Sequence, residues 1–183
     1  MLLLPLFIIG AVIILTYTSY IAKLGFGFSE ISAGLGLGTL PVLGVYIILN
    51  DGYNLSVVYA SIPSGILVFN LLFLNEFPDV NADLEGGRKT LPIILGKHKS
   101  AVFYSVLTSL VYLWILTGVA LKLMPPYTLI ALLTLPIAIK AIKNSFSYSD
   151  KNIFLRAQAA NVQIIMLIQI LIGIGYILGK VIK

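Results

Sequence analysis

Cysteine is absent from the sequence, and histidine occurs once, as His98. Without thiols the chain has neither disulfides nor a thiolate metal site, and one histidine cannot provide a histidine pair for a metal. Charge is also scarce, at 10% of the 183 residues. The net charge of +5 is not organised as a basic stripe with interleaved aromatic residues, which disfavours nucleic acid as a partner.

Apolar residues are in excess. They make up 59% of the chain, and its mean hydropathy is +1.03, whereas a soluble domain is usually about 45–50% apolar. The excess lies in uninterrupted runs, each near the ~20 residues that cross a bilayer core as a helix. The sequence therefore predicts an all-α fold, a polytopic transmembrane helical bundle that forms one domain over residues 1–183. The six expected spans are approximately 2–21, 31–49, 54–74, 100–121, 126–142 and 158–179.

The first expected span begins at Met1. No basic residue precedes its apolar run and no small-residue cleavage site follows it, so the pattern is not that of a signal peptide. A helix that starts within the hydrocarbon, without a flanking anchor, is typical of a chain whose first helices are missing. We therefore expect further helices to precede this sequence in the complete protein.

The distribution of basic residues predicts the orientation in the membrane. If the connections 22–30, 75–99 and 140–157 lie on one side, that side carries nine Lys and Arg residues, and the other carries Lys122, Lys180 and Lys183. The positive-inside rule makes the first side cytoplasmic. We expect a multi-pass protein of the cell membrane, with the connection 75–99 in the cytoplasm and both termini outside.

Glycine and proline recur inside the expected spans. A nucleotide-binding glycine loop is disfavoured because no strand precedes the glycines, and close helix–helix approach through small residues is the better interpretation. Prolines inside the spans are expected to kink them. The glycines are Gly34, Gly36, Gly38, Gly44, Gly173, Gly175 and Gly179, and the prolines are Pro41, Pro63 and Pro136.

The connection 75–99 concentrates the charge, with four carboxylates followed by Arg88 and Lys89. Asp79 and Asp83 are spaced i, i+4, which on a helix places their Cβ atoms about 5–6 Å apart on one face. Two such carboxylates repel unless a cation lies between them, and hard oxygen ligands suit Mg²⁺, which bridges carboxylates to phosphates. Arginine as a fork and lysine as a point charge suit phosphate oxygens. The segment therefore predicts a site for a divalent cation and a diphosphate.

A solvated loop whose four acidic and four basic residues cancel is the alternative. Two observations favour a packed segment instead. Apolar residues flank the charges at Phe77-Pro78 and at 91–95, and no spacer separates the segment from the span 54–74, so Asn75 and Glu76 are expected at the end of that helix. A phosphate-binding loop is rejected, because Gly86-Gly87-Arg88-Lys89-Thr90 lacks the required spacing and follows no strand.

The spacing Asn-x3-Asp-x3-Asp-x3-Gly-basic-basic-Thr-Leu resembles the second aspartate-rich motif of the UbiA superfamily of intramembrane prenyltransferases. The stretch 38–46 is similar to a helix of the 1,4-dihydroxy-2-naphthoate polyprenyltransferase branch, and Glu30 matches the acidic residue of the loop before that helix. The residues that match the motif are Asn75, Asp79, Asp83, Gly87, Arg88, Lys89, Thr90, Leu91 and Gly96.

The resemblance implies a fold of nine transmembrane helices around a central cavity that opens laterally to lipid. Six spans with the motif after the third correspond to helices four to nine. The family's first aspartate-rich motif, between helices two and three, has no counterpart in this sequence. The missing helices are therefore expected either upstream in the same polypeptide or on a separate N-terminal half that acts as a partner, and the chain alone is expected to have little or no activity.

The resemblance also implies a function, Mg²⁺-dependent transfer of a polyprenyl group from its diphosphate to an aromatic acceptor in quinone biosynthesis. A 1,4-dihydroxy-2-naphthoate-like acceptor is favoured, and a menaquinone pathway with it, while hydroxybenzoate, a tetrapyrrole and a glycerol lipid stay open. Asp79 and Asp83 carry over as catalytic metal ligands, Arg88 and Lys89 as diphosphate contacts, and Asn75 as a supporting contact.

The chain departs from the family pattern at three positions. Glu76 stands where an Asp is frequent, Ile94 where a basic residue is common, and Phe26 where the loop before Glu30 usually has a cation. Two other hypotheses remain open, a non-catalytic membrane scaffold of the same fold and a component of a transporter or channel. The last is disfavoured, because it requires ionisable residues in the apolar centres of the spans, where this chain has essentially none.

Overall fold

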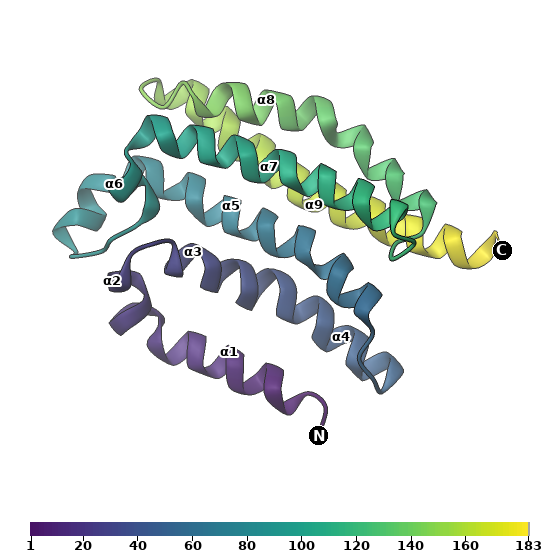
Figure 1. Cartoon of the computed structure of the whole chain (residues 1–183). Coiled ribbons are helices and arrows are strands. Elements are labelled where there is room, and N and C mark those ends of the chain that lie inside the picture. Colours follow the sequence, from purple (N-terminus) through teal and green to yellow (C-terminus); the bar gives the residue numbers. More distant parts are fainter. Residues whose placement is uncertain (183) are drawn as a thin grey trace.

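The computed structural model describes residues 1–182, so Lys183, counted above on the outer side, lies outside the described residues. Long helices run side by side along one direction (Figure 1), and residues 1–182 contain no strand. The elements are α1 (Leu4–Thr16), η1 (Tyr17–Ile21), α2 (Ala22–Leu24), α3 (Phe28–Ala33), η2 (Gly34–Thr39), α4 (Leu40–Asn50), α5 (Leu55–Glu85), α6 (Leu91–Leu95), α7 (Lys97–Ala120), η3 (Pro126–Thr134), α8 (Leu135–Ser145) and α9 (Lys151–Val181).

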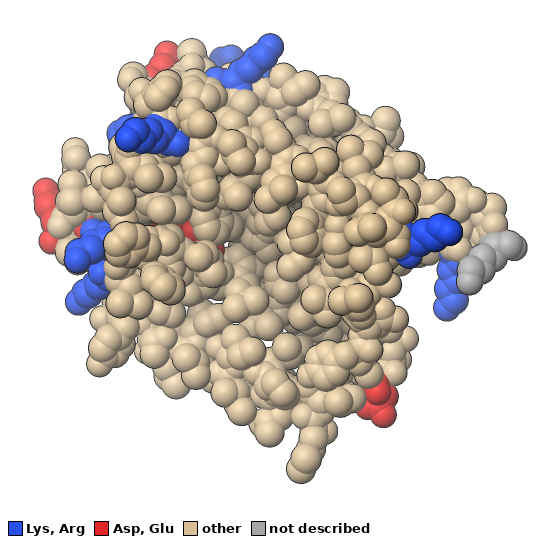
Figure 2. Space-filling model, viewed as in Figure 1, with Lys and Arg blue, Asp and Glu red and all other residues tan. Residues whose placement is uncertain are grey.

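Six helical stretches are long and apolar enough to cross a membrane. They are Leu4–Leu24, Phe28–Asn50, Leu55–Glu85, Lys97–Ala120, Pro126–Ser145 and Lys151–Val181. The prediction of an all-helical polytopic bundle is confirmed. Charged side chains gather toward the ends of the helices on the face seen in Figure 2, and the middle of that face is almost free of them.

The helices follow one another across the bundle. α1 lies at one edge, α3–α4 and α5 come next, and α7, α9 and α8 form the opposite side (Figure 1). The described ends of the chain lie at the same end of the bundle, away from α6. The short elements α2, α3 and α6 therefore belong to the end where α5 finishes and its charged residues lie.

The hydrophobic core belongs to the later helices. Buried residues of α5, α7, η3, α8 and α9 form one cluster, which includes Phe73, Phe77, Tyr104 and Ile164. In contrast, α1 has no buried residue. The fold is therefore a packed group of later helices with α1 standing at its margin.

Hydrogen bonds between buried polar side chains join the core helices. Asn70 of α5 donates to Thr108 of α7 at 3.1 Å, and Tyr104 of α7 donates to Asn161 of α9 at 3.0 Å. Such pairs satisfy polar groups that would otherwise be orphaned in hydrocarbon. They also fix which faces of these apolar helices meet, something that apolar contacts alone specify weakly.

Glycines bring η2 onto α5. A Cβ placed at Gly38 would lie 2.7 Å from the Cα of Gly65, and one at Gly34 would lie 2.6 Å from the Gly65 carbonyl oxygen. The interpretation as small residues in a close helix contact is confirmed for this pair. It is also confirmed for Gly175, whose Cβ would lie 2.6 Å from the backbone of Thr128.

Two of the expected proline kinks coincide with changes of helix type. Pro41 lies in the first turn of α4, directly after the π-helical η2, and Pro136 lies in the first turn of α8, after the 3₁₀ segment η3. Proline lacks the N–H that would continue the preceding hydrogen-bond ladder. Pro63 and Pro78, in contrast, lie inside the single long helix α5.

The segment expected as the polar connection 75–99 is largely helical. α5 continues through Asn75 to Glu85, a turn follows at Gly86 and Gly87, and α6 and the start of α7 complete the segment. α5 continues past Pro78 and ends at the two glycines, and Gly87 adopts a positive φ of 70°. The carboxylates are therefore carried by a rigid helix.

Candidate functional site

The end of α5 presents its acidic residues on different faces. Glu76 and Asp83 are spaced i, i+7 and are both buried, with 4% and 6% of their surface exposed, whereas Asp79 is exposed. A spacing of seven is close to two helical turns, so it returns to the same face more nearly than a spacing of four does. The structure therefore places Asp79 and Asp83 one turn apart on α5, but in different surroundings.

Asp83 is paired with Arg88. The Arg88 Nη1 lies 3.0 Å from the Asp83 Oδ1, and this is the one salt bridge among residues 1–182. The Arg88 backbone N–H also donates to the Asp83 carbonyl oxygen at 2.8 Å, so the turn at Gly86-Gly87 folds the chain back onto the end of α5. The hydrogen bond that Arg88 donates to Asp83 raises the pKa of the Arg88 guanidinium above its ordinary value, which keeps it cationic.

Asp83 retains coordinating capacity. Its second oxygen, Oδ2, is buried without a hydrogen-bond partner in the described chain. Arg88 is only partly buried, and one of its five N–H donors is engaged by a described residue. An anion at this point would meet the free donors, and a cation would meet the free carboxylate oxygen.

Glu30 joins three elements at this end of the bundle. It is fully buried, its Oε1 accepts from the Leu91 backbone N–H at 2.9 Å, and its Oε2 accepts from the Ser29 hydroxyl at 2.7 Å. Its carboxyl also lies close enough to that of Glu76 to interact with it directly. Glu30 therefore ties α3 to the start of α6, and on α5 it is Glu76 rather than Asp79 that faces this joint.

Lys89 and Asn75 also lie at the end of the bundle where α5 finishes. The Lys89 side chain is exposed, and its backbone N–H donates to the Ala22 carbonyl oxygen at 3.2 Å, which holds the turn against α2. The Asn75 Oδ1 accepts from the Gln158 Nε2 at 3.0 Å. This hydrogen bond to α9 orients the amide of Asn75.

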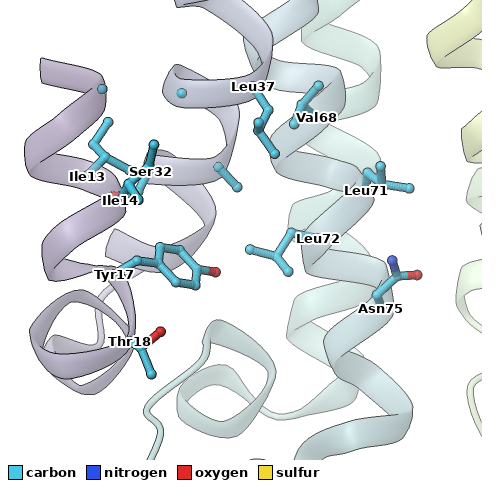
Figure 3. Close-up of a pocket in the computed structure, with 13 residues that line it drawn as sticks. Ile13, Ile14, Tyr17, Thr18, Ser32, Leu37, Val68, Leu71, Leu72 and Asn75 are labelled. Carbon is cyan, nitrogen blue, oxygen red and sulfur yellow. The ribbon is translucent and has the colours of Figure 1, made fainter. Parts of the chain in front are cut away.

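A cavity of about 550 Å³ lies between α1–η1, α3–η2 and α5 (Figure 3). Its volume falls in the usual range for a small-molecule site. Most of its lining is aliphatic, and polar side chains come from Tyr17, Thr18, Ser32 and Asn75. In Figure 3 the ring of Tyr17 extends from η1 toward α5.

Tyr17 connects this cavity with the charged residues. It lines the cavity, and it lies close enough to Arg88, Glu76 and Asp83 for their charges to act on its hydroxyl. An apolar pocket thus adjoins a cluster that contains both a cation and carboxylates. This arrangement suits an amphiphile with an apolar tail and an anionic head.

The carboxylates at the end of α5 fit a Mg²⁺ ion that is also bound by water and substrate phosphates. Among residues 1–182 no group of three or more Asp, Glu, His or Cys side chains is gathered as a metal site. Mg²⁺, however, is commonly held by one or two carboxylates together with waters and substrate phosphates. Asp79, which is exposed, and Asp83, with its unpartnered oxygen, fit that pattern rather than a metal cage made of protein alone.

Sequence reasoning placed the acids, Arg88 and Asn75 at one end of α5, but it missed Tyr17 and Gln158. A visible indication for Tyr17 is the run Thr-Tyr-Thr-Ser-Tyr at 16–20, a polar stretch inside an expected apolar span. Gln158 offered no comparable indication, because its role depends on α9 packing beside α5.

Comparison with known proteins gives consistent matches. A model of the UbiA prenyltransferase family matches residues 1–172. The 1,4-dihydroxy-2-naphthoate octaprenyltransferase of Bacillus subtilis (strain 168) is 32% identical over 117 residues, which cover 63% of this chain and 37% of that protein. The Haemophilus influenzae protein of the same name is 29% identical over 176 residues, which cover 94% of this chain and 56% of that protein.

A third similar protein is the 2-carboxy-1,4-naphthoquinone phytyltransferase of Synechocystis sp. It is 27% identical over 147 residues, which cover 79% of this chain and 48% of that protein. The matches thus extend over 37% to 56% of the length of these relatives, or about half. No solved structure matches the chain.

Proposed function

The chain belongs to the UbiA prenyltransferase family, is an integral membrane protein, and we propose that it takes part in prenyl transfer. The proposed reaction moves a polyprenyl group from its diphosphate to an aromatic acceptor in quinone biosynthesis, with a 1,4-dihydroxy-2-naphthoate-like acceptor. Two similar proteins carry that acceptor in their names, and the third acts, by its name, on a carboxynaphthoquinone.

The observation that carries the proposal is the junction of the apolar cavity with the charged end of α5. The cavity receives the isoprenoid tail, because its lining is largely aliphatic. The diphosphate then lies beyond Tyr17 and Asn75, where Arg88 and Lys89 supply positive charge at the turn after α5. The substrate is therefore oriented with its apolar tail in the cavity and its diphosphate at the turn after α5.

Each proposed site residue has a distinct task. Arg88 binds diphosphate oxygens through the N–H groups that Asp83 does not engage, and Lys89 adds an exposed point charge. Asn75, held by Gln158, contacts the head of the substrate at the mouth of the cavity. Fixed cations aimed at charge that develops on a leaving group lower the barrier, since they need no rearrangement during the reaction.

Asp79 and Asp83 are the proposed ligands of Mg²⁺. When bound there with the substrate diphosphate, the ion supplies Lewis-acid stabilisation of the leaving group. The protein's own contribution is to hold Asp83 rigidly through the Arg88 ion pair and to carry Asp79 one turn earlier on the same helix. We further propose that this end of the bundle faces the cytoplasm, as the positive-inside rule predicts.

We also propose that full activity requires a segment equivalent to the part of the relatives that lies outside the matched regions. The test uses membranes that contain either this chain or a chimera in which it follows the N-terminal portion of the Haemophilus influenzae relative. Transfer of a radiolabelled prenyl group to 1,4-dihydroxy-2-naphthoate is measured with and without added Mg²⁺. We expect Mg²⁺-dependent transfer by the chimera and little by the chain alone.

Two variants test the site residues. In the chimera, Asp79→Asn removes an exposed carboxylate, so we expect lost transfer with an unchanged unfolding midpoint. Asp83→Asn is expected to lose both transfer and stability, because it also breaks the ion pair with Arg88. No transfer by the chimera to any aromatic acceptor would instead support the non-catalytic scaffold.

A further inference from the structure

Three hollows adjoin one another along α1. The first is the cavity of about 550 Å³ described above, the second has about 510 Å³, and the third has about 430 Å³. The first and second share Gly10, Ile14 and Gly36 in their linings, and the second and third share Leu3, Phe7 and Ile48. Together they form a row of adjoining hollows along α1, bordered by η2 and α4 and called the passage below.

The passage is apolar over most of its length. No charged residue lines the first or the second hollow, and an acid, Asp51, lines the third, at the end of the bundle away from α6. The adjoining helix α1 has 13 residues, or about 20 Å at 1.5 Å per residue. The passage therefore crosses much of the ~30 Å hydrocarbon core.

Gly10 and Gly36 form the junction between the first two hollows. A Cβ placed at Gly10 would meet no atom within 4 Å, and one at Gly36 would meet only Ile13, at 3.8 Å or more. These glycines are unlike Gly34 and Gly38, where a Cβ would strike the backbone of α5. Their lack of a side chain is not needed for helix contact, and its effect is to keep the junction open.

We propose that the isoprenoid tail continues from the first cavity through this junction and along α1 and α4, so that Gly10 and Gly36 determine which prenyl lengths are accepted. This inference rests on the proposed function, since it takes the occupant to be a prenyl diphosphate. Continuity favours that occupant over an acyl chain of membrane lipid. The passage begins at Tyr17 and Asn75, beside the cationic turn that would hold a diphosphate.

The test measures binding of two probes, geranyl diphosphate and octaprenyl diphosphate, to the full chain in lipid nanodiscs. Gly36→Leu places a branched side chain in the junction. We expect it to weaken octaprenyl diphosphate binding by about tenfold or more and to change geranyl diphosphate binding by less than about twofold. Gly173→Leu is the matched control, because Gly173 lies on α9, also has open space at its Cβ, and lines none of the three hollows.

Each outcome decides a different question. If Gly36→Leu weakens the binding of both probes equally, or of neither probe, the role of the junction is overturned while the proposed function stays in place. If neither probe binds the unmodified chain or the chimera more tightly than inorganic diphosphate does, the proposed function and the inference both fail.

A second measurement does not depend on how the variant folds. Octaprenyl diphosphate with a photoreactive group at the tail end is crosslinked to the unmodified chain, and the labelled peptides are identified. Labels on α1 and on α4 between Leu40 and Ile48 support the passage. Labels confined to α7, α8 and α9, or on lipid alone, overturn it.

Discussion

Replacing Gly38 with Ala tests how closely η2 packs on α5. The added Cβ would lie 2.7 Å from the Gly65 Cα and 2.7 Å from the Ser64 carbonyl oxygen. Backbone atoms of a packed helix do not yield as the end of a flexible side chain does, so overpacking is expected to cost about 1–3 kcal/mol. The substitution would also disturb the hydrogen bond from the Ser64 hydroxyl to the Gly38 carbonyl oxygen.

Gly44→Ala is the matched control, because a Cβ there would meet nothing within 4 Å. Both substitutions gain the helix propensity of alanine over glycine, about 1 kcal/mol. The difference between the two variants therefore isolates the overpacking at Gly38. We expect the Gly38→Ala variant to unfold about 2–12 °C below the Gly44→Ala variant, at ~2–4 °C per kcal/mol for a chain of this size.

The assay is thermal unfolding of both variants in the same detergent, followed by helix circular dichroism and by a tryptophan signal. If Gly38→Ala unfolds at or above the temperature of Gly44→Ala, η2 does not lie against α5 as described. The reasoning about this helix contact would then be wrong.

Two further predictions concern hydrogen bonds to α9. Gln158→Met removes the donor to the Asn75 Oδ1, so we expect an increased KM for the prenyl diphosphate in the transfer assay. Gln163→Met is the control, because Gln163 is exposed and does not donate to Asn75. We expect its KM to equal that of the unmodified protein. Tyr104→Phe deprives the buried Asn161 of its hydroxyl donor, and we expect about 1–3 kcal/mol of lost stability. Unfolding in denaturant measures this, and an unchanged midpoint would show that the pair contributes nothing.

Much of the fold could be predicted from apolar run length alone. The segment 100–121 became α7 and the segment 31–49 became most of α3, η2 and α4, because a helix is the simplest structure that satisfies its own backbone in lipid. The end of the third helix was harder to predict. The polar residues after Leu74 suggested a connection, yet the helix accommodates Pro78, and α5 continues out of the apolar segment as far as Glu85.

The site was predictable in its residue types and less so in its geometry. An i, i+4 spacing correctly put Asp79 and Asp83 on one helix, but which acid is buried depends on contacts with residues outside α5. Glu76 is buried because Glu30 and α6 cover that face of α5, and Asp83 because Arg88 folds back upon it. Glu30 and Leu91 are far apart in the sequence, and the Asp83–Arg88 pair depends on the turn between the two residues, so helical spacing alone shows neither contact.

The π-helical segments were also beyond local prediction. η1 spans Tyr17–Ile21 and η2 spans Gly34–Thr39, and both border the first cavity. A π turn widens the helix by one residue per turn and is often found at functional sites. Its formation depends on how neighbouring helices meet, because the wider turn is stabilised by what packs against it.

The extension of α5 beyond the apolar segment has an entropic consequence. Residues Asn75 to Glu85 are already fixed in helical geometry before any substrate arrives. Ordering a flexible loop of about ten residues would cost roughly 10–20 kcal/mol of backbone conformational entropy, at ~1–2 kcal/mol per residue. Diphosphate association at this end of the bundle is therefore expected to avoid the entropic cost of ordering this segment.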